Sequence, residues 1–341
     1  MNSECNFLMP RESGKFIAES ATHVILKNAE IKKFAGIILE NFKCQESSVN
    51  SCEHSNFLDK NDPKVADLIL FIDTLNFCFW NDANNLKWKV NGETGYFALC
   101  AAIKRALKAG IPITDAIFLS KITHDELQKI LQGDQDSGEI PLLHERVQNL
   151  NEVGQVLIKK YNGTFVECIK SCNNSAEKLL KLIVHNFKCF RDEANYKNYQ
   201  VSFYKRAQIL VADIWSCCQG EGLGAFNDID YITMFPDYRV PQVLIYFGVM
   251  QYNNELLNKL QSGVTLEQRS VEEIEIRGCS IAAVERIIDE IKILKRENPT
   301  LYLDKLQYNS IYIDYFLWEY RRKHAEKLKD IPYHKVRTIF Y

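Results

Sequence analysis

Apolar residues that recur every three or four positions are the feature that most constrains how this chain can fold. Residues 12–42 show the pattern over a stretch long enough for two helices. The apolar members of this stretch are Phe16, Ile17, Val24, Ile31, Phe34, Ile37 and Ile38. Because residues three and four positions apart lie on one face of a helix, the stretch predicts two amphipathic helices that bury one side.

The helical pattern continues through most of the chain. Residues 95–110 predict a helix that ends at Gly110, shortly before Pro112. Residues 123–133 predict a short helix with Thr123 as its N-cap and Glu126 three positions later. Further helices are predicted at 141–161, 175–187, 203–220, 253–263 and 310–329. The fold class is therefore expected to be mainly α, with few strands.

Three segments depart from a simple helical pattern. Residues 86–99 alternate around Asn91-Gly92, a dipeptide typical of tight turns, and predict a small β-hairpin. Residues 66–80 are nearly continuously apolar, and we expect a short buried strand or a loop that enters the core. Residues 270–298 predict two helices joined by a tight turn at 276–280.

The chain has no internal repeat, low-complexity stretch or linker rich in proline, glycine and serine. A single domain over residues 1–341 is therefore predicted, and two helical lobes of about 1–200 and 201–341 with one shared core are the alternative. A hydrophobic content of 46% and a charged content of 25% are ordinary for globular proteins, and they exclude global disorder.

The charge balance limits the class of partner. The 42 Lys and Arg residues against 44 Asp and Glu residues give a net charge of −2. Proteins that bind nucleic acid through its phosphates carry a basic excess, so no stable nucleic-acid complex is expected. A small anionic ligand stays open, because one or two cations are enough to bind it. We expect a monomer.

Targeting signals and membrane spans are also missing from the printed sequence. The first 20 residues lack a basic region followed by an apolar run, and no stretch approaches 18 uninterrupted apolar residues. We therefore expect a soluble protein of the cytoplasm, with the nucleus as an alternative.

Cysteine and histidine spacings do not match a zinc site. The 11 cysteines include no C-x2-C pair, and the seven histidines form no H-E-x-x-H or H-x3-H pattern. The sequence predicts no metal and no organic cofactor.

The segment "ITMFPDYRVPQ", residues 232–242, carries polar groups on a constrained backbone. Its two prolines each remove a backbone donor, and they push the preceding residues towards extended conformations. An irregular, rigid segment is expected that holds Phe235, Asp237 and Arg239. The Phe235 ring could stack on a planar heterocycle, and the neighbouring Asp237 carboxylate could accept hydrogen bonds from that heterocycle. The alternatives are a core phenylalanine and a turn aspartate that bonds backbone amides.

Asp314 lies on a strongly aromatic helix, within "IYIDYFLWEY". A carboxylate on an apolar face is costly unless it is paired or hydrogen-bonded, and its surroundings can shift its pKa far. Asp314 is thus either a structural buried carboxylate or an acid that acts on a ligand.

Several other polar residues are weaker candidates. Lys205, Arg206 and Arg239 could bind a phosphate, and a solvated surface position is the alternative for each. Asp73 and Asn76 interrupt an apolar run, and structural hydrogen bonding is the favoured interpretation.

The "EIRGCSIAAVE" stretch is similar to a helix-hairpin-helix element, in which a glycine-bearing loop contacts a phosphate. A glycine C-cap followed by a serine N-cap also joins many ordinary helix pairs. A helix-hairpin-helix DNA glycosylase is therefore an alternative function, and the acidic charge balance opposes it. A non-catalytic module that binds modified nucleotides is a further alternative.

Motifs along nearly the whole chain resemble those of the queuosine salvage protein family, the queuosine 5′-phosphate N-glycosylase/hydrolases. In chain order they are MPRESGKFIAE, DTLNFCFW, GYFALCAAIKRALKAGIPIT, VSFYKRAQILVADIW, ITMFPDYRVPQ, IEIRGCSIAAVE, IDYFLWEY and IPYHKVRTIFY. The resemblance implies a compact, mostly α-helical fold similar to that of helix-hairpin-helix DNA glycosylases. It also implies hydrolysis of queuosine 5′-monophosphate to queuine, for salvage into tRNA, and ribose 5-phosphate.

The resemblance also implies roles for individual residues. The family's acid in its D-Y-x-L-W motif corresponds to Asp314, and its ligand-contacting positions correspond to Phe235, Asp237 and Tyr315. A family histidine corresponds to His54. Glu319 stands where the family's motif has a second aspartate, so the negative charge is kept on a side chain one methylene longer.

Bond chemistry suggests how these residues would act. Cleavage of an N-glycosidic bond builds positive charge on the sugar, which an ionised Asp314 could stabilise or attack. Asp237 could donate a proton to the leaving base or recognise its edge. Lys205, Arg206 and Arg239 are the expected phosphate ligands.

Overall fold

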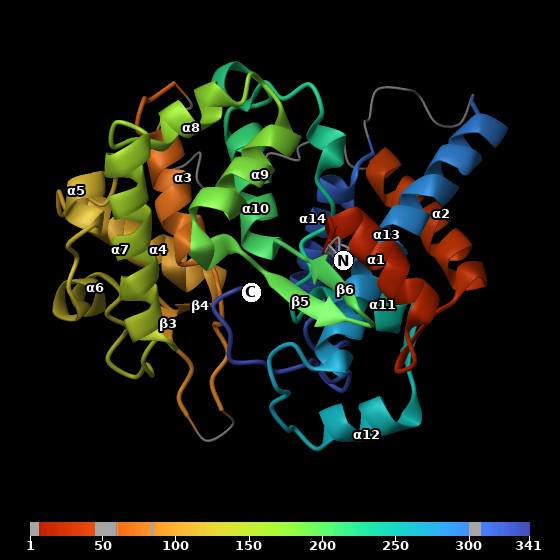
Figure 1. The fold of residues 1–341 in the computed structure, drawn as a ribbon. Coiled ribbons are helices and arrows are strands. Elements are labelled where there is room, and N and C mark those ends of the chain that lie inside the picture. The colour runs from red at the N-terminus through yellow and green to blue at the C-terminus, as the bar shows by residue number, and fades with distance from the viewer. Residues whose placement is uncertain (1–6, 45–58, 60, 83–84, 300–307) are drawn as a thin grey trace, which may run out of the picture. The chain divides into compact units, whose positions relative to one another are not determined.

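A computed structural model of the protein describes residues 7–44, 59, 61–82, 85–299 and 308–341, and these residues are mainly helical with small sheets (Figure 1). They form two compact units, each assembled from separate parts of the chain. Unit 1 comprises Met1–Val49, Asp192–Lys205 and Ile232–Arg337. Unit 2 comprises Asn50–Arg191, Arg206–Tyr231 and Thr338–Tyr341. The predicted small strand content is confirmed.

Unit 1 contains six helices and five short strands among its described residues. The helices are α1 (Pro10–Ser20), α2 (Asn28–Cys44), α11 (Val240–Tyr246), α12 (Asn254–Gln261), α13 (Val271–Glu297) and α14 (Ser310–Lys323). The strands are β1 (Phe7–Leu8), β2 (Val24–Leu26), β5 (Glu193–Tyr196), β6 (Tyr199–Ser202) and β7 (Met250–Tyr252). The two helices predicted in residues 12–42 are confirmed as α1 and α2.

Two small sheets connect distant parts of unit 1. β6 pairs in parallel with β1 and antiparallel with β5, which gives the order β1-β6-β5. β2 pairs antiparallel with β7, with Val24 opposite Tyr252. The second sheet therefore joins the connection between α1 and α2 to the segment that follows α11.

Helix α13 is the central helix of unit 1, and it packs against α1, α2, α11 and α14. The expectation of a tight turn at 276–280 is wrong, because α13 continues through these residues without interruption. Gly278 does not have the positive φ of a helix-ending glycine. A Cβ on Gly278 would lie 2.4 Å from Cδ1 of Ile17 on α1, so this glycine permits the close approach of two helices.

Unit 2 is built mainly from helices. The α-helices are α3 (Val65–Thr74), α4 (Tyr96–Lys108), α5 (Ala116–Leu119), α6 (His124–Ile130), α7 (Leu143–Lys160), α8 (Phe165–Ser171), α9 (Ala176–Asn186) and α10 (Lys205–Cys217, whose first residue belongs to unit 1). Short 3₁₀ helices are η2 (Lys188–Phe190), η3 (Gly222–Gly224) and η4 (Ile229–Tyr231). Among the described residues of unit 2, β3 (Lys89–Val90) and β4 (Glu93–Thr94) form a hairpin.

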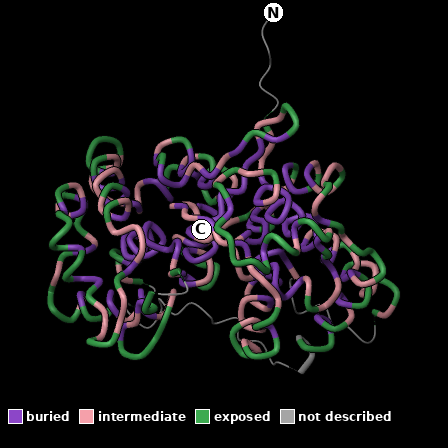
Figure 2. Tube along the Cα trace, turned by 90° about the horizontal axis from the view of Figure 1, so that it is seen from below, coloured by how far each residue is buried: buried purple, intermediate pink, exposed green. Residues whose placement is uncertain are grey.

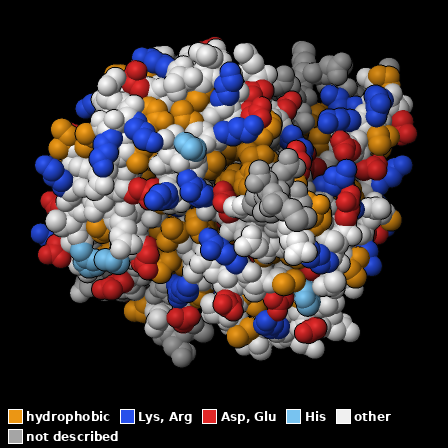
Figure 3. Space-filling view, viewed as in Figure 1, with side chains coloured by type: hydrophobic (Ala, Val, Ile, Leu, Met, Phe, Trp, Pro, Cys, Tyr) orange, Lys and Arg blue, Asp and Glu red, His pale blue; other side chains and the backbone are white. Residues whose placement is uncertain are grey.

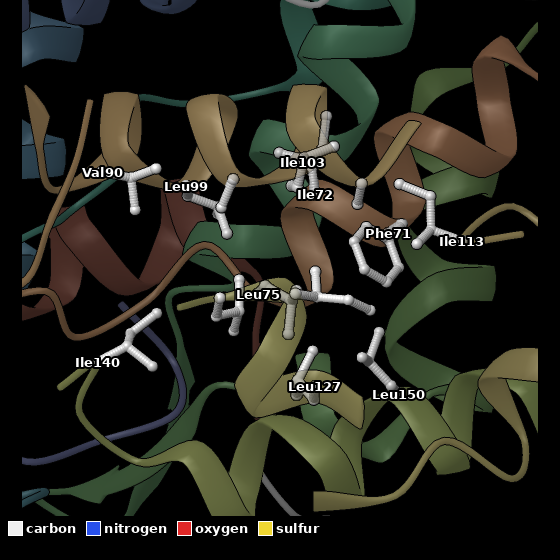
Figure 4. Packing of buried hydrophobic residues seen from close by; sticks show 14 of the residues in the cluster. Phe71, Ile72, Leu75, Val90, Leu99, Ile103, Ile113, Leu127, Ile140 and Leu150 are labelled. Atoms are coloured by element: carbon white, nitrogen blue, oxygen red, sulfur yellow. The ribbon is translucent and has the colours of Figure 1, made fainter. Parts of the chain in front are cut away.

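The apolar core of unit 2 surrounds α3 (Figure 4). Phe71, Ile72 and Leu75 belong to this cluster together with Leu99 and Ile103 of α4. The expectation of a strand or loop at 66–80 is therefore wrong for residues 66–74, which are helical. All ten residues of α3 are buried, and a helix buried on every side has the same continuous apolar pattern as a buried strand.

The local signals for turns and caps are confirmed. Asn91 and Gly92 have φ angles of 54° and 78°, which suits the tight turn between β3 and β4. The Thr123 side chain accepts a hydrogen bond from Glu126 N, and Glu126 accepts one from Thr123 N, which together complete the predicted capping box. Gly110, with a φ of 72°, follows the end of α4.

Burial and charge follow the expectations for a globular chain. Exposed residues concentrate in the outer loops and helix faces of the trace (Figure 2). On the face drawn in Figure 3, acidic and basic side chains are interspersed. None of the helices in the described ranges combines the length and apolar character needed to cross a membrane. The same ranges contain no group of three or more His, Cys, Asp or Glu residues that could hold a metal ion.

Candidate active site

The segment before α11 is buried and irregular in unit 1. Residues 232–236 are buried without regular secondary structure, and Phe235 is 3% exposed. The predicted irregular segment is therefore confirmed up to Arg239. α11 begins at Val240, with Pro241 in its first turn, where the missing N–H removes no helical hydrogen bond.

Asp237 caps the turn between this segment and α11. Its Oδ1 accepts hydrogen bonds from Arg239 N at 2.7 Å and from Val240 N at 2.8 Å. These are the backbone bonds expected of a turn aspartate. Oδ2 of this half-buried carboxylate makes no hydrogen bond with the described residues.

Asp314 is buried on α14 and faces the same segment. It is 4% exposed, and its Oδ1 accepts a hydrogen bond from Phe235 N at 3.0 Å. Among the described residues, it has no ion-pair partner. Burial raises the pKa of Asp314 well above its usual value, and the charge of Asp237 raises it further. The Phe235 hydrogen bond and the charge of Lys205 act in the opposite direction on this pKa.

The aromatic candidates lie together beside these carboxylates. The Phe235 and Tyr315 rings have centroids 6.3 Å apart and an interplanar angle of 67°. This is an edge-to-face contact between the two rings, as favoured for aromatic pairs, and not a pair of parallel plates. A flat ligand would therefore have an aromatic ring next to two carboxylates.

Two of the predicted phosphate ligands, Lys205 and Arg239, lie near these carboxylates. Lys205 is 7% exposed and close enough to Asp314 to influence its pKa. The Arg239 guanidinium lies 3.8 Å above the Tyr333 ring, and its Nη1 donates to Gln242 Oε1 at 3.3 Å. Gln242 Nε2 in turn donates to Leu328 O at 3.3 Å, which connects α11 to the chain after α14.

The remaining predicted candidates have different surroundings. Glu319 is half-exposed and pairs with Lys323, one turn along α14. Arg206, in unit 2, is buried and donates to Asp73 O at 3.1 Å and to Thr74 O at 2.8 Å, so the alternative of a solvated surface position is wrong for this residue. Asn76 Nδ2 donates to Asp73 Oδ1 at 3.3 Å, as the structural interpretation predicts. His54 lies outside the described residues.

Sequence reasoning missed an ion pair that adjoins the site. Arg277 donates to both oxygens of Asp192, at 3.0 and 2.5 Å, and its Nε donates to Pro236 O at 3.0 Å. The available signal was a charged residue on the buried face of "EIRGCS". Gly278 indicates a turn in this stretch, and that interpretation overlooks Arg277.

Comparisons with known proteins give the family of the chain. The family model described as queuosine salvage protein matches residues 55–341. A queuosine 5′-phosphate N-glycosylase/hydrolase from Bos taurus is 43% identical over 343 residues, which cover 98% of this chain and 99% of the relative. A protein of the same name from Sphaerobacter thermophilus is 40% identical over 282 residues, which cover 81% of each chain. The chain therefore belongs to the queuosine salvage protein family.

Proposed function

We propose that this protein hydrolyses the N-glycosidic bond of queuosine 5′-monophosphate and releases queuine for salvage into tRNA. Its relatives are named queuosine 5′-phosphate N-glycosylase/hydrolases. The observation that carries the proposal is the carboxylate of Asp314, which is buried without an ion-pair partner among the described residues and bonded to the backbone of Phe235. A buried acid with a strongly perturbed pKa beside an aromatic ring is typical of a catalytic site.

Asp314 acts on the sugar in this proposal. The bond between the anomeric carbon and the base breaks, positive charge develops on the sugar, and water supplies hydroxide to that carbon and a proton to the base. The ionised Asp314 stabilises the developing charge or attacks the anomeric carbon. Burial makes Asp314 difficult to ionise, and it also strengthens the attraction between the carboxylate and a cationic sugar.

Phe235, Tyr315 and Asp237 bind the base in this proposal. Phe235 offers an aromatic ring on a backbone tied to Asp314, and Tyr315 contacts its edge. Asp237 turns its second oxygen to donors on the base or returns a proton to the leaving group. Because Asp237 is anchored through Oδ1, this second oxygen has a defined position.

Lys205 and Arg239 are the proposed ligands of the 5′-phosphate. Lys205 lies near Asp314, and Arg239 lies two residues after Asp237. Glu319 and His54 are proposed substrate contacts from the family resemblance alone. No metal or organic cofactor is required for this hydrolysis.

The wider organisation is also proposed from the resemblance and the sequence. We propose one domain over residues 1–341, a fold related to the helix-hairpin-helix DNA glycosylases, a monomer, no stable nucleic-acid complex and a cytoplasmic location. The continuous α13 removes the hairpin-like turn that favoured DNA glycosylase activity as an alternative.

The direct test offers purified protein queuosine, its 5′-monophosphate and intact tRNA, with free queuine measured by mass spectrometry. We expect release from the monophosphate, much less from the nucleoside and none from tRNA. Binding of the monophosphate without release of queuine would favour a non-catalytic binding module. Excision of damaged bases from duplex DNA would favour the DNA glycosylase.

A further inference from the structure

Arg277 lies on α13, and its buried guanidinium donates hydrogen bonds to two distant segments of unit 1. It is 2% exposed, and its two Nη atoms bind the two oxygens of Asp192. Its Nε donates to Pro236 O at 3.0 Å, and the Phe203 ring lies 4.3 Å from its Cζ. A bidentate pair fixes both the position and the plane of the guanidinium.

Asp192 connects the same pair to a second part of the chain. Its Oδ2 also accepts a long hydrogen bond from Lys205 N at 3.4 Å, and its backbone oxygen accepts one from Phe203 N at 3.0 Å. Burial and the charge of Arg277 lower the pKa of the buried His334 to about 3. His334 is therefore uncharged at neutral pH.

Each member of this ion pair also bonds to the backbone beside or within a proposed site residue. Pro236 lies between Phe235 and Asp237, and its carbonyl is the group that Arg277 holds. Phe235 N, on the other side of Phe235, donates to Asp314. The Asp192 end holds the backbone of Lys205, whose charge acts on Asp314.

We propose that Arg277 and Asp192 are positioning residues that set Phe235 and Lys205 in register with Asp314 through the Pro236 carbonyl and the Lys205 amide. The inference rests on the proposed function, since it assigns these residues to the same reaction. Neither side chain touches the reacting atoms. They act through the backbone of the residues that do.

A small displacement of the base or the carboxylate has a large effect on rate, because an error near 1 Å costs on the order of a hundredfold. We therefore expect loss of the pair to lower kcat by about tenfold to a hundredfold, with a smaller change in KM. A purely structural pair would affect activity only through the amount of folded protein.

The decisive variant replaces the whole buried charge cluster, as Asp192→Leu with Arg277→Met and Glu273→Gln, because Arg277 Nη1 also lies 3.6 Å from Oε1 of the buried Glu273. Replacing all members of a buried ion pair or triad in this way is often neutral for stability, whereas removing one partner is not. We expect folded protein with a Tm close to that of the wild type and a kcat at least about tenfold lower. The control, Lys259→Gln with Glu272→Gln, removes the pair between α12 and α13 and is expected to keep kcat unchanged.

The conservative variant Arg277→Lys covers the case in which the triple variant does not fold. Lysine keeps the charge but cannot bind Asp192 and Pro236 in the same planar arrangement. We expect lower kcat with unchanged circular dichroism. Wild-type kcat in the folded triple variant overturns the proposal. If only Arg277→Lys folds, wild-type kcat in that variant overturns it.

Hydrogen exchange separates this inference from the proposed function. The amides of residues 234, 235 and 237–239 are expected to exchange faster in the folded variants than in the wild type, with no such change in the control. If the wild type releases no queuine, the proposed function fails. If the wild type is active and the variants show wild-type kcat and exchange, only the positioning role fails.

Discussion

Two regions of unit 1 each bury an aspartate, and they treat its charge in opposite ways. Beside α13, Asp192 is 3% exposed and receives two hydrogen bonds from the Arg277 guanidinium. On α14, Asp314 is 4% exposed and receives one hydrogen bond from a neutral backbone amide. The degree of burial is the same, and only the compensation of the charge differs.

In the proposed function, this difference separates a structural acid from a reactive one. A buried carboxylate opposite a bidentate arginine is stable as an anion and offers little to a ligand. A buried carboxylate without an ion-pair partner is a poor anion, and a cationic group close to it would be strongly stabilised. Under the proposed function, Asp192 belongs to the framework and Asp314 is the acid that meets the cationic sugar.

The largest expected effect comes from breaking the compensated pair on one side only. Arg277→Met leaves Asp192 and the neighbouring Glu273 buried without their cation. Removing one partner of a buried ion pair typically costs about 3–5 kcal/mol of unfolding free energy. Urea unfolding followed by circular dichroism measures this loss. Lys259→Gln, which breaks an ion pair with an exposed lysine, is the control and should cost less than about 1 kcal/mol. Similar losses in the two variants would contradict the contrast.

The complementary change neutralises Asp314, the buried acid that has no ion-pair partner among the described residues. Asp314→Asn should lower kcat by at least about a hundredfold, a typical cost for removing an electrostatic group that stabilises a transition state. The amide oxygen can still accept the Phe235 N–H, so the fold is expected to persist. Queuine release under saturating substrate measures the effect, and full activity would remove Asp314 from the mechanism.

The same variant has a stability signature with a defined sign. The pKa of Asp314 is raised in the folded protein, so this residue contributes stability below the unfolded pKa of about 3.9 and loses it as pH rises through the folded pKa. Asp314→Asn avoids that loss. Its unfolding free energy should therefore gain on that of the wild type as pH rises above about 4. A difference independent of pH would argue against an uncompensated carboxylate.

A smaller effect tests the close packing of α13 against α1. Gly278→Ala places a methyl group against Ile17, and overpacking of this kind typically costs about 1–3 kcal/mol. Thermal unfolding measures the loss. Gly36→Ala on α2 is the matched control, because a Cβ there meets no atom within 4 Å. It should be neutral or stabilising by up to about 1 kcal/mol.

The smallest expected effect is a shift in pH dependence. The negative charge of Asp237 raises the pKa of Asp314, so Asp237→Asn should lower that pKa and move the acid limb of kcat/KM to lower pH. Turnover should also weaken, because the base loses a charged contact. Glu326→Gln, which removes an exposed charge paired with Lys329, is the control and should leave the limb in place.

Local patterns predicted the parts of the fold that depend on neighbours in sequence. The Asn91-Gly92 hairpin and the Thr123 cap formed where expected, because their hydrogen bonds lie within a few residues. The errors at residues 66–74 and 276–280 have another cause. A helix buried on all sides lacks amphipathic periodicity, and a glycine that permits helix contact looks like one that ends a helix.

Sequence alone determined the mainly helical class and the constrained segment around Phe235. Through the family motifs, it also singled out Asp237 and Asp314 as candidate acids, and the structure brings the backbone of Phe235 to Asp314. Only the tertiary structure decided that Arg277 pairs with Asp192, 85 positions away in the chain, and holds Pro236. The reason is physical: propensity and periodicity act over a few residues, whereas the compensation of a buried charge depends on which distant groups the fold brings within hydrogen-bonding distance.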